Sequence, residues 1–357
     1  MAKPGAVAPL AVTMGEPAGI GTEVVLKAYA AVRSGAAGPC LPFFLIDDPA
    51  RVAAVARALP IDVPCTSIEA PRNAAEAFAT GLPILPLSGV DFEALTNITP
   101  GQPDVAAAKA VITSIEQAVF LTLEGEASGV TTLPIQKSIL QEAGFSFPGH
   151  TEFLGALTAR TTMPQGRTRG PVMMLAAGSF RTVPVTIHLP LREVPAALTA
   201  DLIVEVATVT AQALASDFGI ASPRIAIAGL NPHAGEDGRM GTEERTIIIP
   251  AIEALRSKGI AAAGPFPADT MFHEDARTHY DAALAMYHDQ GLVPIKTAAF
   301  HEAVNVTIGL PIIRTSPDHG TGLPIAGKGA ARPDSTIAAL VMASHMAAQR
   351  SAARRSA

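Results

Sequence analysis

The chain carries VPVTIHLPLR at residues 183–192, RIAIAGLNPHAGE at 224–236 and AALAMYHDQG at 282–291, and each stretch is an apolar run followed by a histidine. Runs rich in Val, Ile, Leu and Ala predict strands that are buried on both faces, as in a parallel sheet. Similar runs alternate with helix-like segments along almost the whole chain. This alternation predicts an α/β fold with a mostly parallel sheet covered by helices.

The three histidines of these stretches occupy equivalent places. His188, His233 and His288 each follow the carboxyl end of a predicted strand, which is the edge where α/β proteins bind ligands. A single such histidine is usually structural or solvated. Three together favour a catalytic metal site, because neutral imidazole is a common metal ligand and three protein ligands leave one position open for substrate.

Length and composition limit the class of protein. A chain of 357 residues exceeds the usual single core, so we expect two domains. Hydrophobic residues make up 48% and charged residues 16%, which predicts a packed globular protein. The net charge is −6 and no Lys/Arg cluster stands out, so we expect no nucleic-acid partner.

The sequence also indicates the compartment. Cys40 and Cys65 show no CxxC spacing, which is typical of a reducing environment. The start, MAKPGAVAPLAV, is a poor match to a signal peptide, and no uninterrupted apolar run approaches the roughly 18 residues of a membrane span. We therefore expect a cytoplasmic protein without a membrane partner.

Two segments carry groups that suit an anionic substrate. PGHTEFLGAL (148–157) places His150 and Thr151 at a predicted helix start, with Thr151 as candidate N-cap. Such a start either binds an anion or is simply capped. Lys296 and Arg314 follow the third histidine in apolar surroundings, where an unpaired cation is costly, so they are candidates to neutralise an acidic substrate.

The glycine-rich segments do not match a standard nucleotide motif. Neither GxGxxG nor GxxxxGK[ST] is present, and GEPAGIG (15–21) indicates only a tight strand-to-helix turn. SPDHGTGLPIAGKG (316–329) follows a predicted strand and contains Asp318, His319 and Thr321. Its glycines would let the backbone approach a nucleotide, although a mobile loop has the same composition.

Several longer motifs point to a known family. They include TMGEPAGIGTEVV, PIQKSILQEAGFSFPGHTEFL, GLNPHAGEDGRMGTEE, AMYHDQGLVPIK and VNVTIGLPIIRTSPDHGTG. Together these motifs resemble the 4-hydroxythreonine-4-phosphate dehydrogenase family of vitamin B6 biosynthesis. The resemblance implies a two-domain, mostly parallel α/β/α sandwich similar to the isocitrate and isopropylmalate dehydrogenases. Residues 1–128 plus about 303–357 would form a terminal domain with the cofactor loop, and about 129–302 a central domain with the metal ligands and dimer contacts. The active site would lie in the cleft between them.

The resemblance also implies an activity. Family members oxidise 4-phosphooxy-L-threonine with NAD or NADP, and the product loses CO₂ to give 3-amino-2-oxopropyl phosphate, a precursor of pyridoxine 5′-phosphate and pyridoxal phosphate. By analogy, one divalent ion (zinc, magnesium or cobalt) is held by His188, His233 and His288. The resemblance further implies a homodimer whose active site is shared between the subunits.

The remaining site residues are carried over by motif. The implied substrate-binding positions are His150, Thr151, Lys296, Asn305 and Arg314. The implied cofactor-binding positions are Asp318, His319, Gly320, Thr321 and Gly327. Oxidation and decarboxylation both need proton transfer, and the candidates for it are Asp269 in GPFPADT and Lys137 in PIQKSI.

Two alternatives stay open at this point. A sister dehydrogenase could act on D-threonate or D-erythronate 4-phosphate, which carry a hydroxyl where the first substrate has its amino group. A metal-dependent hydrolase or aldolase could use the same three histidines without a nicotinamide cofactor.

Overall fold

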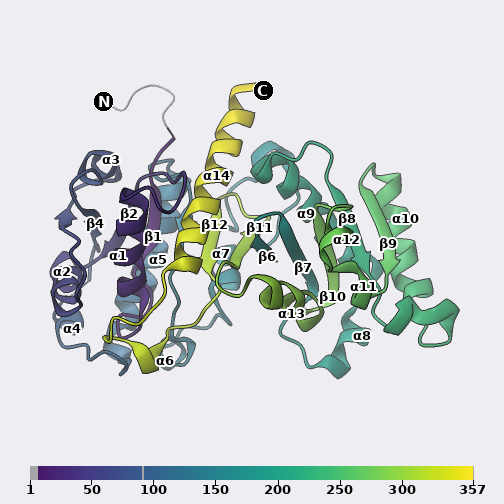
Figure 1. Ribbon diagram of the computed structural model, residues 1–357, viewed down its shortest axis with the longest axis horizontal. Helices are drawn as coiled ribbons and strands as arrows, with labels where there is room; N and C mark the ends of the chain where they lie inside the picture. Colours follow the sequence, from purple (N-terminus) through teal and green to yellow (C-terminus); the bar gives the residue numbers. More distant parts are fainter. Residues whose placement is uncertain (1–6, 91, 357) are drawn as a thin grey trace. The chain divides into compact units, whose positions relative to one another are not determined.

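The computed structural model describes residues 7–90 and 92–356, which divide into two compact units (Figure 1). Unit 1 comprises Met1–Thr161 and Pro311–Ala357, and unit 2 comprises Thr162–Leu310. The first six residues, on which part of the argument against a signal peptide depends, lie outside the described residues.

Unit 1 contains a parallel sheet in the order β3-β4-β2-β1-β5-β12. Its strands are β1 (Leu10–Thr13), β2 (Phe43–Asp47), β3 (Cys65–Ser67), β4 (Leu82–Pro86), β5 (Val130–Thr131) and β12 (Arg314–Pro317). Every residue of β1 and β2 is buried, as the continuous apolar runs predict.

The helices of unit 1 connect these strands. They are α1 (Gly21–Arg33), α2 (Pro49–Ala58), α3 (Ala74–Ala77), α4 (Glu93–Thr96), α5 (Ala108–Leu123), α6 (Lys137–Glu142), α7 (His150–Thr158) and α14 (Asp334–Ser356). Asp48 caps α2 by accepting the N–H groups of Ala50 and Arg51, and Pro49 occupies the first turn.

The division between the units differs from the boundaries expected at residues 128 and 303. Residues 129–161 belong to unit 1, because β5 pairs with both β1 and β12 and the following helix α7 packs against α5. At the second boundary, β11 (Val304–Ile308) belongs to unit 2, because it pairs along its whole length with β6 (Val172–Ala177).

Unit 2 contains a mixed sheet in the order β11-β6-β7-β10-β8-β9. Its other strands are β7 (Phe180–Thr186), β8 (Arg224–Ala228), β9 (Ala261–Phe266) and β10 (Ala282–Tyr287). β6 runs antiparallel to β11 and β7, whereas β7, β10, β8 and β9 are mutually parallel. The fold is therefore the mostly parallel α/β class that the sequence predicts.

The helices of unit 2 include two long core elements. They are α8 (Val194–Ala197), α9 (Ala200–Phe218), α10 (Ile249–Ser257), α11 (Ala268–Met271), α12 (Glu274–Arg277) and α13 (His288–Ala299). α9 packs on β6, β7 and β8, and α13 packs on β6, β7 and β10. Leu292 and Ile295 of α13 join a core cluster with Met173, Leu175 and Phe180 of the sheet.

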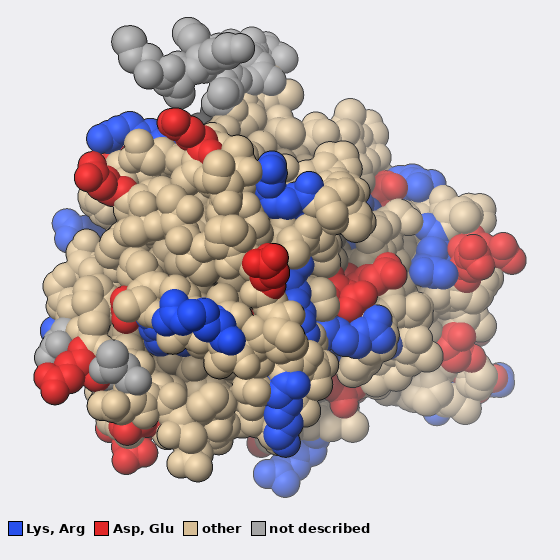
Figure 2. Space-filling model, turned by 60° about the vertical axis from the view of Figure 1, so that its left-hand side comes forward, with Lys and Arg blue, Asp and Glu red and all other residues tan. Residues whose placement is uncertain are grey.

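Two further features are the apolar helices that could cross a membrane and the distribution of charge on the surface. Among the described residues, Val105–Leu123 is long and apolar enough to cross a membrane, as is the bent pair Leu191–Ala197 and Ala200–Phe218 taken together. Half of the first window is buried, and α5 packs on β1 and β2 as a core helix does. On the face drawn in Figure 2, Lys and Arg side chains are interspersed with Asp, Glu and wide uncharged areas.

The cap of α2 generates a stability prediction. Asp48→Ala should lower the free energy of unfolding by about 1 kcal/mol, because two N–H groups lose their acceptor. Asp48→Asn keeps an acceptor oxygen and should retain most of that stability. Urea unfolding followed by circular dichroism compares the two variants, and equal losses would contradict the capping role.

Candidate functional site

The ends of three neighbouring strands in unit 2 carry the three histidines. β10 lies between β7 and β8, with Tyr287 opposite Thr186 and Leu284 opposite Ile227 (Figure 1). His188 follows β7, His288 is the first residue of α13 directly after β10, and His233 lies in the loop after β8. Parallel pairing thus brings the three histidine-bearing segments to one edge of the sheet.

His188 and His288 approach each other closely. Their ring centroids are 5.7 Å apart, and both side chains line a hollow of about 230 Å³. His288 Nδ1 is hydrogen-bonded to Asp289 Oδ1 at 2.7 Å. Such a bond orients an imidazole and directs its Nε2 away from the carboxylate, as is common for metal-binding histidines.

His233 does not complete a group with this pair. Within residues 7–90 and 92–356, no three His, Cys, Asp or Glu side chains lie close enough together to form a metal site. One chain therefore offers two imidazoles side by side and a third on a neighbouring loop.

The backbone at two of these histidines is left-handed. His188 has φ of 53° and His233 has φ of 52°. His233 begins a run in which Ala234, Gly235, Glu236 and Asp237 also have positive φ. Each non-glycine residue in this conformation costs roughly 1–2 kcal/mol. Strain of this kind is typical of functional sites, and it must be compensated by the surroundings.

Glu244 anchors the start of the His233 loop. Its side chain is 2% exposed, and Oε1 accepts the backbone N–H groups of Leu230 and Asn231 at 2.8 and 2.7 Å. Its Oε2 accepts from Asn231 Nδ2 at 3.0 Å. A side chain at Gly235 would meet Glu244 Oε2 at 2.5 Å, so glycine is required there. Nothing in the local sequence signals this buried carboxylate, and Glu244 is not among the site residues that the sequence predicts.

Asp269 and Lys296 lie near these loops, whereas Asn305 lies level with Leu175 and Thr182, near the start of β7. Asp269 is exposed in the first turn of α11, which packs against the loop of His233. Lys296 lines a hollow of about 430 Å³ together with His288. Asn305 is half-buried on β11, opposite Leu175 of β6.

Unit 1 gathers positive charge around His150. Arg314 is 3% exposed at the start of β12, and its Nε and Nη2 donate to Thr132 Oγ1 at 3.2 and 2.8 Å. The Lys137 ammonium also acts on His150. His150 Nε2 is buried and has no hydrogen-bond partner among the described residues. A buried, unsatisfied nitrogen beside two cations fits an anion, because an imidazole N–H would donate to the anion and both positive charges would attract it.

The electrostatics of this cluster follow from burial. Burial, with Arg314 and Lys137 nearby, holds the pKa of His150 well below its usual value. Burial also lowers the pKa of Arg314 to about 10, and the charge of Glu152 opposes that shift. Arg314 therefore stays charged at neutral pH while His150 is neutral. Thr132 and Glu152 are not among the site residues that the sequence predicts.

Thr151 is not the helix cap that the sequence predicts. α7 begins at His150, with Gly149 as the N-cap residue in extended conformation, so Thr151 is the second residue of the helix. A Cβ at residue 149 would lie 3.3 Å from Lys137 Nζ. Glycine at the cap therefore lets Lys137 approach the start of α7.

The predicted cofactor loop packs against the GEPAGIG turn. Ile20 N donates to Thr321 O at 2.9 Å, and a Cβ on Gly19 would collide with the same oxygen at 2.6 Å. Thr321 Oγ1 donates to Gln136 Oε1 at 3.2 Å, a contact to which the sequence analysis assigned no role. The turn is thus part of the loop's support rather than an isolated tight turn.

Individual residues of this loop suit a ligand. His319 Nε2 is buried with no hydrogen-bond partner in the described chain, while Nδ1 bonds Gly320 O at 2.9 Å. Gly320 faces open space, and Gly327 has φ of +74° with Pro100 against it. Asp318 N donates to Ser335 Oγ at 2.9 Å, which anchors the start of the loop.

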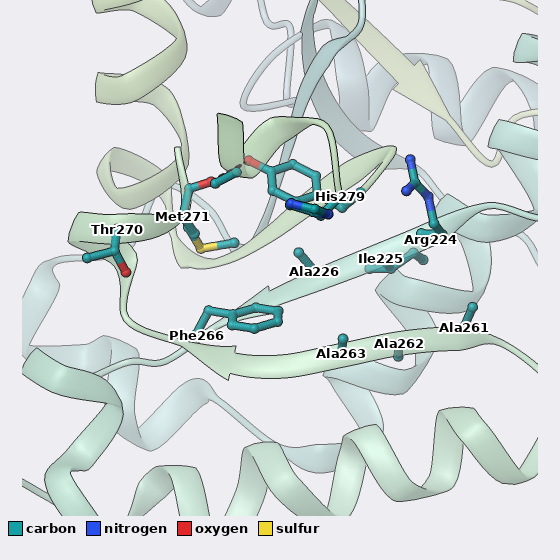
Figure 3. A pocket seen from close by; sticks show the side chains of 12 residues that line it. Arg224, Ile225, Ala226, Ala261, Ala262, Ala263, Phe266, Thr270, Met271 and His279 are labelled. Atoms are coloured by element: carbon teal, nitrogen blue, oxygen red, sulfur yellow. Dashed lines mark hydrogen bonds between the residues drawn. The ribbon is translucent and has the colours of Figure 1, made fainter. Parts of the chain in front are cut away.

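A further hollow of about 500 Å³ lies over β8 and β9 (Figure 3). Its wall is mostly apolar, from alanines 226 and 261–263, Phe266 and Met271, and Arg224, Thr270, His279 and Tyr280 also line it. Burial raises the pKa of Tyr280 to about 12, and its hydroxyl donates to Met271 O at 2.8 Å. The lining therefore offers mainly apolar contact.

Comparisons with known proteins agree over almost the whole chain. A family model described as Pyridoxal phosphate biosynthetic protein PdxA matches residues 39–343. A 4-hydroxythreonine-4-phosphate dehydrogenase of Caulobacter vibrioides is 50% identical over 342 residues, covering 96% of this chain and 98% of the relative.

Solved structures give the same result. A 4-hydroxythreonine-4-phosphate dehydrogenase from Klebsiella pneumoniae is similar with a TM-score of 0.82 and 35% identity, covering 95% of this chain and 99% of that one. A terephthalate 1,2-cis-dihydrodiol dehydrogenase from Burkholderia xenovorans follows with a TM-score of 0.63 and 26% identity, covering 95% and 98%.

The lowered pKa of His150 generates a pH prediction. Below the usual pKa of 6.5, the unfolded chain binds a proton at His150 that the folded chain does not, so the free energy of unfolding falls as the pH falls. His150→Gln should flatten this dependence between pH 7 and pH 5, by up to about 1.4 kcal/mol per pH unit. Unfolding by urea at several pH values measures it.

The matched control is His345→Gln, which removes an exposed histidine of the same unit. If His150→Gln retained the full pH dependence of the wild type, His150 would not be the buried neutral group.

Proposed function

Because this chain belongs to the pyridoxal phosphate biosynthetic protein PdxA family, we propose that it catalyses the NAD- or NADP-dependent oxidation of 4-phosphooxy-L-threonine. The oxidised product then loses CO₂ to give 3-amino-2-oxopropyl phosphate. An oxidoreductase is favoured over a metal-dependent hydrolase or aldolase, because the relatives at 50% and 35% identity described above are named dehydrogenases. The pathway is that of vitamin B6, and we propose a cytoplasmic location.

The observation that carries this proposal is the cationic cluster of unit 1. Arg314 and Lys137 supply two positive charges beside the unsatisfied Nε2 of His150. A neutral imidazole protonated at Nε2 would donate one hydrogen bond to an anionic oxygen, and Arg314 would pair with the same group. These groups match a substrate that carries a phosphate and a carboxylate. We propose Thr151, Lys296 and Asn305 as its further contacts.

The histidine edge of unit 2 fits a divalent metal. His188 and His288 present adjacent imidazoles, and the strained backbone at His188 and His233 indicates that their positions matter more than local stability. We propose that His188, His233 and His288 hold zinc, magnesium or cobalt. When bound, such an ion supplies a Lewis acid that stabilises negative charge on the substrate oxygen.

The glycine-rich loop fits a nicotinamide cofactor. His319 offers a buried nitrogen without a partner in the described chain, and Gly320 leaves open space beside it. We propose Asp318, His319, Gly320, Thr321 and Gly327 as the binding positions. When bound, NAD or NADP supplies the hydride acceptor.

The chain itself must move protons. One proton leaves the substrate hydroxyl as the ketone forms, and one returns to the carbon that loses CO₂. We propose Asp269 and Lys137 for these transfers, because a carboxylate and an ammonium can accept and donate a proton respectively.

We also propose a homodimer with a shared active site. The resemblance implies it, and the hollow over β8 and β9 offers an apolar surface that a partner subunit would cover. Phe266 on that surface is 39% exposed, and Asp269 lies shortly after it. A partner on this surface would bury Phe266 and bring the loops of two subunits together.

One assay tests the activity. Formation of NADH or NADPH is followed with 4-phosphooxy-L-threonine and, separately, with D-threonate 4-phosphate, after chelation and return of zinc, magnesium or cobalt. We expect faster turnover of the first substrate. Faster turnover of the second would identify the sister dehydrogenase, and no reduction with either would contradict the dehydrogenase assignment.

The cationic contacts generate a kinetic prediction. Arg314→Ala and Lys296→Ala should each raise the KM for the phosphorylated substrate about ten- to a hundredfold, because a charge-assisted hydrogen bond contributes about 1.5–3 kcal/mol. The KM for the nicotinamide cofactor should change far less. Steady-state kinetics with each substrate varied in turn measures both values.

Matched controls are Arg33→Ala and Lys258→Ala, which remove exposed cations of the same two units. Equal effects of Arg314→Ala on both KM values would contradict a role in binding the substrate anion.

The shared site generates a complementation prediction. His233→Ala and His288→Ala should each be inactive alone, because each lacks a metal ligand. If the two histidines of one site come from different subunits, half of the sites in a mixed dimer hold only intact ligands, and mixing the variants restores activity. Native mass spectrometry verifies that subunits exchange. Complete exchange without activity would overturn the shared site.

A further inference from the structure

Backbone pairing between β10 and β8 stops just before the histidine loops. The last paired residues are Leu284 of β10 and Ile227 of β8. Beyond these residues, the side chain of Gln290 forms the hydrogen bonds that link the two strand ends. Gln290, in the first turn of α13, lies between the two strand ends.

Both polar atoms of the Gln290 side-chain amide form hydrogen bonds. Its Oε1 accepts the backbone N–H of Met286 at 2.6 Å, and its Nε2 donates to the carbonyl of Gly229 at 2.7 Å. The side chain is only 8% exposed. A primary amide can do this because it offers a donor and an acceptor, as a peptide group does. Gln290 thus continues the hydrogen-bonding of the sheet by one step.

Thr186 makes the matching connection on the other side of β10. Its Oγ1 donates to the carbonyl of Met286 at 2.7 Å, and its side chain is buried. Met286 is therefore held from both sides, through its N–H by Gln290 and through its carbonyl by Thr186. The three strand ends form one hydrogen-bonded unit.

Each end of this unit leads directly to a histidine. Thr186 precedes His188 by two residues, and Met286 precedes His288 by two. Gly229 begins the loop of His233, and a Cβ at Gly229 would collide with Ala234 at 2.8 Å. Direct backbone pairing keeps strands about 4.8 Å apart. The side-chain amide of Gln290 lies between Met286 and Gly229, so these strand ends are farther apart than directly paired strands. Its two hydrogen bonds still fix the distance between them.

We propose that Gln290 and Thr186 are positioning residues that fix the backbone of the three segments carrying His188, His233 and His288, so that each segment presents its imidazole to a divalent cation in the shared site. The inference rests on the proposed function, because it takes these histidines as metal ligands. Neither side chain needs to touch the ion. Their bonds act on the backbone of the three segments, and outer contacts of this kind are worth about ten- to a hundredfold in metal affinity.

Conservative variants isolate the two bonds. Gln290→Glu keeps the shape and the acceptor but removes the donor to Gly229, and Gln290→Leu removes both. Thr186→Val keeps the shape and removes the hydroxyl, whereas Thr186→Ser restores it. The matched control is Gln212→Leu, which removes a 2.7 Å bond from a glutamine to the backbone N–H of Thr168 elsewhere in unit 2.

The experiment titrates the full-length, metal-free protein with Zn²⁺ by calorimetry. We expect Gln290→Leu, Gln290→Glu and Thr186→Val to weaken binding about ten- to a hundredfold, and Thr186→Ser and Gln212→Leu to stay within about threefold of wild type. A second measurement, hydrogen exchange, is made on the metal-free protein. Hydrogen exchange of residues 229–238 should be faster in Gln290→Leu than in Gln212→Leu.

The outcomes separate the two proposals. Unchanged Zn²⁺ affinity in the Gln290 and Thr186 variants, or an equal loss in Gln212→Leu, overturns the positioning role while wild-type dehydrogenase activity still supports the proposed function. A wild type that binds Zn²⁺ but reduces no cofactor contradicts the proposed function alone. A wild type that binds no divalent ion overturns both.

Discussion

Parallel pairing of β7, β10 and β8 is the constraint on which the histidine edge of unit 2 depends. Parallel strands end on the same side of a sheet, so side chains that follow them in sequence become neighbours in space. The approach of the His188 and His288 rings to 5.7 Å follows from this pairing. The loop of His233 departs from regular structure, and the buried carboxylate of Glu244 stabilises it by accepting three N–H donors.

In unit 1, the candidate site depends on a buried charge rather than on strand pairing. Arg314 lies in the interior with Thr132 as a hydrogen-bond acceptor, and His150 next to it is kept neutral by burial and by the neighbouring cations. A folded chain tolerates such an arrangement at a cost in stability. Under the proposed function, an anionic substrate bound at this cluster would offset that cost.

Much of this could be predicted from particular residues. The apolar runs LAVT and FFLID became the buried strands β1 and β2, and Asp48 with Pro49 marked the start of α2. The motifs around His150, His233, His288 and Arg314 led to the family that the comparisons then identified. Local patterns suffice here because periodicity, caps and long motifs are properties of neighbouring residues.

The sequence by itself determined the α/β class, the family and the types of group available for chemistry. Only the tertiary structure decided which groups meet: that GEPAGIG supports the loop at 318–327, and that Glu244 and Gln290 hold the histidine loops. These contacts join residues that are distant in the chain or depend on left-handed backbone and burial. No local propensity encodes them, because their energy comes from partners that only the folded chain brings together.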